Sequence, residues 1–296
     1  MDLEEKKYWI AFSVFEGIGP VRFKLLKDYF GSAKNVFEAS EKNLKETGLS
    51  EKIINNFLDF RQSFDFSSYL LRLDRLGINV LAYDEENYPK LLKNIEDKPI
   101  VIYAKTKKKN DFSIFDRKTI AVVGTRRITA YGKQVTAMLA KGLVEKGWVI
   151  VSGLARGVDR VAHETTIYNK GLTVAVLGCG LEMVYPSEHR QLAEKIIESG
   201  GMLISEFPPG TPMAAKNFPL RNRIISGMSL GVVVTEAAEK SGSLITASCA
   251  AQQGREVFAV PGPINSPLSQ GTAQLIKKGA KLVSNINDII EELNVS

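Results

Sequence analysis

The chain has 296 residues, of which 44% are hydrophobic and 24% are charged, and its formal net charge is +6. This composition excludes wholesale disorder and predicts a globular protein with a large core, on a length that suits roughly two domains. The positive charge permits a polyanionic partner such as nucleic acid but identifies none. Residues 1–7 are too charged for a secretory signal, and no apolar stretch is long enough to span a bilayer, so we expect no membrane association and a cytoplasmic location.

Ligands for a metal ion or a disulfide framework are scarce in this sequence. Cys179 and Cys249 are isolated thiols without CxxC spacing, and His163 and His189 supply the only imidazoles. We therefore predict no metal site, and we expect both cysteines to fill the core.

A small helical domain is predicted over residues 1–76, because apolar residues such as Val21, Leu25 and Tyr29 recur there at helical spacing. The helices are interrupted at residues 17–20, 31–32 and 47–48. The turn Gly17-Ile18-Gly19-Pro20 resembles the hairpin of a helix-hairpin-helix module, whose glycines let backbone amides approach a DNA phosphate. A plain connector between helices explains the same turn and is the simpler interpretation, since a short Gly-x-Gly turn is weakly specific.

Short apolar strands alternate with helices in the rest of the chain. Strands are expected at residues 80–83, 100–103, 120–123, 148–151, 173–177, 202–205, 231–235 and 257–260, and helices at 131–146, 158–169 and 189–198. Such alternation predicts a doubly wound α/β domain whose mostly parallel sheet is covered on both faces. We assign this domain to residues 77–285 and a short C-terminal tail to residues 286–296.

Ligands of such sheets bind beyond the carboxyl ends of the strands, so the loops at those ends are the places to look for a site. Gly124-Thr125-Arg126 follows one strand but lacks the G-x-G-x-x-G of a dinucleotide site, which argues against NAD and leaves no cofactor predicted. Gly153 follows the next strand, in a loop where glycines permit close ligand approach or simply a tight turn. Ser241-Gly242-Ser243 opens a later helix, and its hydroxyls and amides suit either a phosphate or an ordinary N-cap.

The segment from Lys216 to Gly227 carries the most specific signal. Phe218 offers a face on which a base can stack beside the cations Arg221 and Arg223, an arrangement typical of single-strand binding. Arg221 and Arg223 are two residues apart and diverge on a regular helix, although both can face one ligand at an irregular helix start. The structural alternative is that Phe218 fills the core and one arginine pairs with a carboxylate such as Glu236. No nucleophile with a base and no paired carboxylates accompany these groups, so we predict a binding protein and not an enzyme.

Four segments together resemble the DNA-processing protein A (DprA/Smf) family. They are Val123-Gly124-Thr125-Arg126, Gly153-Leu154-Ala155-Arg156-Gly157-Val158-Asp159, Phe218-Pro219-Leu220-Arg221-Asn222-Arg223-Ile224-Ile225-Ser226-Gly227 and Ser241-Gly242-Ser243-Leu244-Ile245-Thr246-Ala247. The resemblance runs from the region of Tyr88 to Ala280, and the helical residues fit the family's sterile-alpha-motif-like domain more loosely.

The resemblance implies an extended Rossmann fold that forms a homodimer, binds single-stranded DNA in a basic pocket and loads the RecA recombinase during natural transformation. The implied pocket consists of Gly124, Thr125, Arg126, Gly153, Lys216, Phe218, Arg221, Asn222, Arg223, Ser241, Gly242 and Ser243. The family often has a basic residue three places before the phenylalanine, where this chain has Ala215, with Lys216 one step later. Many relatives continue into a winged-helix domain, which we do not expect after the acidic segment at 287–294.

Two other functions compete with this one. Lysine-decarboxylase-like phosphoribohydrolases also place arginines and glycine-rich loops around a phosphate, but their P-G-G-x-G-T-x-x-E stretch has a glutamate that Ser241-Gly242-Ser243-Leu244 lacks. An interaction scaffold that binds no nucleic acid would leave the arginines unexplained.

Overall fold

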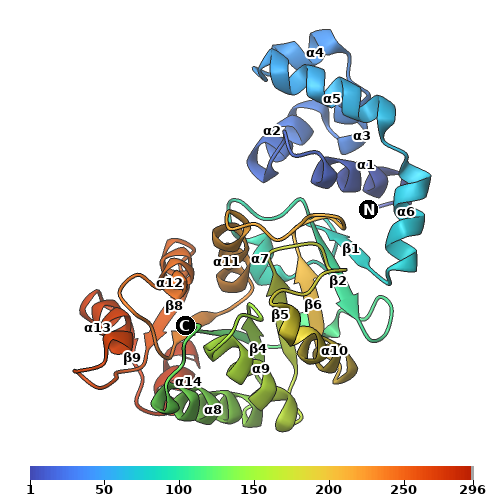
Figure 1. Cartoon of the computed structure of the whole chain (residues 1–296). Coiled ribbons are helices and arrows are strands. Elements are labelled where there is room, and N and C mark those ends of the chain that lie inside the picture. Colours follow the sequence, from blue (N-terminus) through green and yellow to red (C-terminus); the bar gives the residue numbers. More distant parts are fainter. Residues whose placement is uncertain (295–296) are drawn as a thin grey trace.

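The computed structural model describes residues 1–294, and in it a helical region precedes a large sheet (Figure 1). The helical region comprises α1 (Leu3–Val14), α2 (Pro20–Phe30), α3 (Ala33–Glu38), α4 (Glu41–Glu46), α5 (Glu51–Ser63) and α6 (Phe66–Arg75). The interruptions predicted from the sequence are confirmed. Gly31 ends α2 in the left-handed conformation, with φ of 87°, and Pro20 begins the same helix, where its missing N–H costs nothing.

The sheet is mixed and mostly parallel, as predicted. Its strands are β1 (Asn79–Ala82), β2 (Val101–Thr106), β3 (Thr119–Val123), β4 (Val149–Ser152), β5 (Thr173–Leu177), β6 (Met202–Ser205), β7 (Gly231–Val234), β8 (Glu256–Ala259) and β9 (Lys281–Leu282). They are arranged in the order β1-β2-β6-β5-β4-β3-β7-β8-β9. The pairs β1–β2 and β2–β6 are antiparallel, and the other neighbours are parallel.

Helices cover both faces of this sheet (Figure 1). They are α7 (Lys90–Lys93), α8 (Ala130–Glu145), α9 (Val158–Tyr168), α10 (Arg190–Glu198), α11 (Asn217–Gly227), α12 (Gly242–Gln252), α13 (Gln270–Lys277) and α14 (Asn287–Asn294). Alternate residues of β3 enter different cores: Ile120 and Val122 lie with side chains of α8 and α9, whereas Ala121 and Val123 lie with side chains of α11 and α12. The buried strands therefore have the continuous apolar sequences from which they were predicted.

The direction of winding reverses between β3 and β7. From β3 the chain proceeds outward through β4, β5 and β6, and it then returns to place β7 on the other side of β3. The loops that follow β3 and β7 consequently diverge to opposite faces and leave a crevice between them, which is where open α/β sheets bind ligands.

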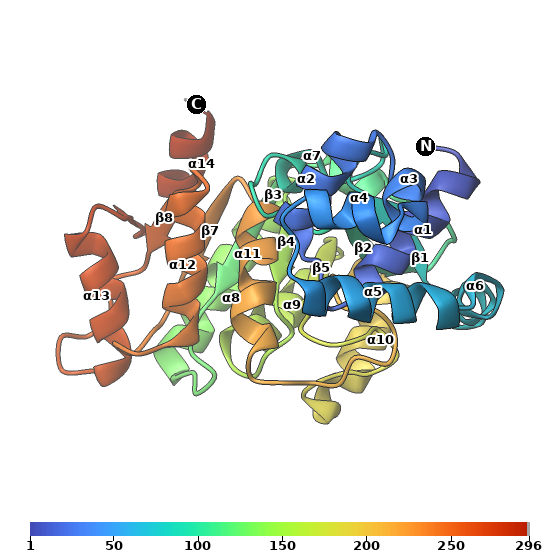
Figure 2. The same cartoon turned by 90° about the horizontal axis from the view of Figure 1, so that it is seen from above.

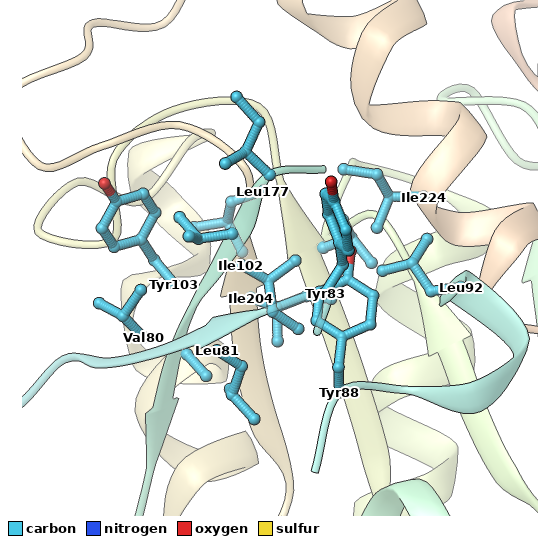
Figure 3. Close-up of a cluster of buried hydrophobic side chains, with 14 of the residues drawn as sticks. Val80, Leu81, Tyr83, Tyr88, Leu92, Ile102, Tyr103, Leu177, Ile204 and Ile224 are labelled. Carbon is cyan, nitrogen blue, oxygen red and sulfur yellow. The ribbon is translucent and has the colours of Figure 1, made fainter. Parts of the chain in front are cut away.

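The helical region packs against the antiparallel edge of the sheet (Figure 2). The ring of Trp9 lies 4.6 Å from that of Tyr83, and the hydroxyl groups of Ser13 and Tyr103 are 2.6 Å apart. Figure 3 shows Tyr83 and Tyr103 among the apolar side chains of β1, β2, α7 and α11. The helical core and the core on this face of the sheet form one continuous cluster.

The segment predicted as a C-terminal tail contains helix α14. Ile289 and Leu293 of this helix are buried in the core that α8 and α9 cover. Residues 295–296, the end of the predicted tail, lie outside the described residues.

Candidate functional site

A pocket of about 640 Å³ opens at the carboxyl ends of β3 and β7, in the crevice where the winding reverses. Its walls come from the loops after β3, β4 and β7 and from the first half of α11. Nine of the twelve predicted site residues line it: Gly124, Thr125, Arg126, Phe218, Arg221, Asn222, Ser241, Gly242 and Ser243.

Thr125 fixes the loop that follows β3. Its amide donates to the carbonyl of Glu236 at 2.7 Å, and its own carbonyl accepts from the amide of Val158 at 3.1 Å. Gly124 permits this approach, because a Cβ there would lie 2.5 Å from a methyl group of Val158 and 2.7 Å from the Glu236 carbonyl. The loops after β3, β4 and β7 are thereby held together, and Arg126 is presented to solvent at their junction.

A cation and an aromatic ring meet at the mouth of the pocket. The guanidinium of Arg126 lies 5.1 Å from the ring centroid of Phe218, within the range of a cation–π contact. Phe218 is half-buried at the start of α11 and so does not fill the core, which was the structural alternative. Both a ring and a planar guanidinium can support a nucleobase.

Arg221 forms the floor of the pocket and is 4% exposed. Its Nη1 donates to the carbonyl oxygens of Gly153 and Val176 at 2.6 and 2.7 Å. A Cβ on residue 153 would coincide with this guanidinium, so Gly153 is required for packing the arginine. Burial lowers the pKa of Arg221, and the carboxylate of Asp159 opposes that effect. The result is a cation within the protein at the base of the pocket.

Asp159 holds the loop that follows β4. Its carboxylate accepts from the amides of Gly153 at 3.0 Å and Ala155 at 3.3 Å, and so orients this loop from the start of α9. Burial raises its pKa, while Arg221 and these amides counteract the rise. Asp159 lines the pocket but was not among the predicted contact residues.

The first turn of α12 forms the wall opposite the β3 loop. Ser241 is the N-cap, and its hydroxyl accepts from the amide of Ser243 at 3.4 Å. Asn222 of α11 donates to the carbonyl of Gly242 at 3.3 Å and joins the two helices. The N-cap interpretation is confirmed, and the same turn still directs the positive end of a helix into the pocket.

Three predicted residues lie outside the lining of this pocket. Gly153 is buried beneath Arg221, whereas Lys216 and Arg223 line a second cavity between the helical region and the sheet. Because α11 is a regular helix from Asn217 onward, the side chains of Arg221 and Arg223, two positions apart, point in different directions. DNA contacts of Lys216 and Arg223 stay a prediction.

Arg223 is 8% exposed and engaged with carboxylates. Its Nη2 donates to both carboxylate oxygens of Glu206, at 2.5 and 2.6 Å, and its Nε lies 3.3 Å from a carboxylate oxygen of Asp97. Burial raises the pKa of Glu206, and Arg223 limits that rise. The sequence suggested Glu236 as the partner of an arginine, but Glu236 instead accepts from the amide and hydroxyl of Thr129, at 2.9 and 2.7 Å.

Two further residues of the pocket region, Arg127 and Tyr185, were not among the site residues predicted from the sequence. Arg127 follows Arg126 in the same loop and lines the main pocket. Tyr185 lies in the loop after β5, with its ring 5.9 Å from that of Phe218. The adjacent arginines made Arg127 detectable from the sequence, whereas the approach of Tyr185 to Phe218 depends on the fold.

Within residues 1–294, no group of three or more His, Cys, Asp or Glu side chains is placed to hold a metal ion. Over the same range, no helix combines the length and the apolar character needed to cross a membrane.

The fold and the pocket define a Rossmann-like α/β protein with a cationic, aromatic-lined site at its topological switch point. A family model described as DNA recombination-mediator protein A matches residues 79–294. DNA processing protein DprA of Bacillus subtilis is 48% identical over 218 residues, which cover 73% of this chain and 72% of that protein. Protein Smf of Synechocystis sp. is 36% identical over 98% of this chain and 73% of its own length. The chain belongs to the DNA recombination-mediator protein A family.

Solved structures agree with this assignment. The X-ray structure of DNA processing protein A from Streptococcus pneumoniae has a TM-score of 0.83 and 31% identity, with 98% of each chain covered. DNA processing protein A from Helicobacter pylori, whose single-stranded DNA binding mode has been described, has a TM-score of 0.65 and 32% identity, covering 74% of this chain and 96% of that one. The first match includes the helical region, and both support the extended Rossmann-like fold.

Proposed function

We propose that this chain binds single-stranded DNA in the pocket between β3 and β7. The observation that carries the proposal is the contact of Arg126 with Phe218 at the pocket mouth, above the buried cation of Arg221 and beside the first turn of α12. Cations and amide dipoles attract phosphates, and the aromatic ring accepts an unpaired base without reading its identity. The single-stranded DNA binding mode described for the Helicobacter pylori relative supports the same ligand class.

In the cell, we propose that the protein protects incoming DNA and loads RecA during natural transformation, in the cytoplasm and as a homodimer. The family assignment as a recombination mediator supports this role. For the dimer, the segment from Leu268 to Leu282 is our candidate interface, since Leu282 at its end is a large apolar side chain left 45% exposed.

We propose binding without catalysis. Asp159 is the carboxylate that lines the pocket, and its oxygens accept from the amides of Gly153 and Ala155 next to the charge of Arg221. A general base must be free to take a proton from the substrate or a water molecule. The competing function, hydrolysis of a nucleotide as in phosphoribohydrolases, would require Asp159 to leave these partners.

Titration with labelled single-stranded and duplex oligonucleotides at several salt concentrations tests the proposal. We expect a clear preference for the single strand, because bases in a duplex cannot present a free face to Phe218. Equal affinity for the duplex would refute the proposed site chemistry.

Incubation with nucleoside monophosphates separates binding from catalysis. We expect no release of free base above background. Release that disappears in Asp159→Asn, with thermal stability retained, would favour the phosphoribohydrolase function instead.

A further inference from the structure

A second aromatic ring stands next to Phe218. Tyr185 lies in the loop between β5 and α10, is 42% exposed, and has its ring centroid 5.9 Å from that of Phe218 with 50° between the two planes. The two rings come from segments more than thirty residues apart, on different loops. Fold topology alone brings them together at the carboxyl end of the sheet.

A small cavity of about 40 Å³ is lined by both rings. Its lining includes both rings and the side chains of Arg126, Arg156 and Arg221. Arg126, Phe218 and Arg221 also line the main pocket, so the two spaces adjoin. Arg156 forms a bidentate ion pair with Glu188, with both distances 2.6 Å.

The base of this region retains unused hydrogen-bonding capacity. The Nε of Arg221 is buried and has no hydrogen-bond partner among the described residues. Burying an N–H donor without an acceptor costs free energy, and a hydrogen bond to an anionic or carbonyl oxygen would offset that cost. The cluster therefore combines the exposed ring of Tyr185 and the half-buried ring of Phe218 with a buried N–H donor that has no protein partner among the described residues.

We propose that Tyr185 is a second base-stacking residue, which holds the nucleotide adjacent to the one at Phe218. This inference rests on the proposed binding of single-stranded DNA. Bases stacked on two rings tilted by 50° are themselves tilted by about the same angle. Neighbouring bases in a duplex are stacked parallel, so only an unpaired strand can occupy both faces. The tilt thus makes Tyr185 a determinant of single-strand selectivity as well as affinity.

Three variants test this role by equilibrium titration with a short oligothymidylate. Tyr185→Ala should weaken binding by about 5-fold to 150-fold, the equivalent of one lost stacked base, without changing the salt dependence. Tyr185→Phe should bind like the parent, because it keeps the ring. Tyr168→Ala is the matched control: this tyrosine is 87% exposed at the end of α9, outside both spaces, and its loss should leave affinity unchanged.

An abasic scan of the parent protein gives a second readout that does not depend on folding of any variant. In the shortest oligonucleotide that binds with full affinity, removal of a base should weaken binding at two neighbouring positions. With Tyr185→Ala, one of these two penalties should disappear. Loss at a single position, or parental affinity of Tyr185→Ala, would overturn the inference.

The same measurements distinguish failure of this inference from failure of the proposed function. If the parent binds single strands and Phe218→Ala weakens binding while Tyr185→Ala does not, only the second stacking face is refuted. If the parent shows no preference for single strands, the proposed function fails first.

Discussion

The salt dependence of DNA binding is the most direct test of Arg126. This side chain is exposed at the pocket mouth, and its guanidinium lies 5.1 Å from the ring centroid of Phe218. If Arg126 neutralises one phosphate, Arg126→Ala reduces the slope of log affinity against log salt by about 0.7. Between about 50 and 200 mM salt, the affinity ratio of parent to variant should then fall by roughly 2.6-fold.

The stability of Arg126→Ala should change little. An exposed cation–π contact contributes about 0.5 to 1 kcal/mol to the free energy of unfolding. Fluorescence anisotropy at four or five salt concentrations, with thermal melting of the same samples, measures both quantities.

Arg160→Ala is the matched control for the lost charge. Arg160 is an exposed arginine of α9, paired with Glu164 at 2.8 Å, and it is absent from the lining of the pocket. Its removal should leave the salt slope at the parental value. If Arg126→Ala melts normally and also keeps the parental slope, the pocket between β3 and β7 is not the phosphate-binding surface.

Other predictions follow from the buried groups and from the proposed dimer. Arg223→Ala should lower the free energy of unfolding by about 3 to 5 kcal/mol in chemical denaturation, because Glu206 loses its partner. Gly153→Ala should cost about 1 to 3 kcal/mol by displacing the guanidinium of Arg221, and an unchanged denaturation midpoint would contradict the packing described. Burial lowers the pKa of His163 to about 3, so below about pH 6.5 the unfolded chain binds more protons than the folded protein. The free energy of unfolding should therefore fall by about 2 kcal/mol from pH 7 to pH 5. This loss should vanish in His163→Gln. Light scattering at micromolar concentration should return the mass of a dimer, and a monomer mass without bridged DNA complexes would refute the proposed assembly.

The inner strands of the sheet were predictable because they are buried on both faces, whereas the exposed two-residue strand β9 was not predicted. Strands 173–177 and 202–205 have the bounds that the sequence predicts, whereas the strand predicted at 100–103 extends to Thr106, beyond its apolar run. The position of the pocket was also predictable from the sequence, because the loops at the carboxyl ends of parallel strands lie at one edge of the sheet.

The roles of individual side chains were less predictable, because they depend on distances between loops. The sequence gives no reason to assign Arg221 and Arg223 different roles. In the structure, Arg221 lies under the pocket, whereas Arg223 pairs with Glu206 on a different face of α11. Gly153 indicates a close approach in the sequence, but only the structure shows that the approaching group is a guanidinium. Tyr185 carried no recognisable motif.

The shared core has a practical consequence for dissecting this protein. Trp9 packs on Tyr83 and Ser13 bonds to Tyr103, so the first six helices cover apolar surface of the sheet edge. Cutting the chain near residue 76 would leave that surface and the outer strand β1 open to solvent, a combination that promotes aggregation. If such a truncation lost DNA binding, the cause could be either the damaged sheet edge or the loss of a DNA contact in the helices. Single substitutions on the surface of α2 to α5 would therefore be the more informative way to examine the helical region.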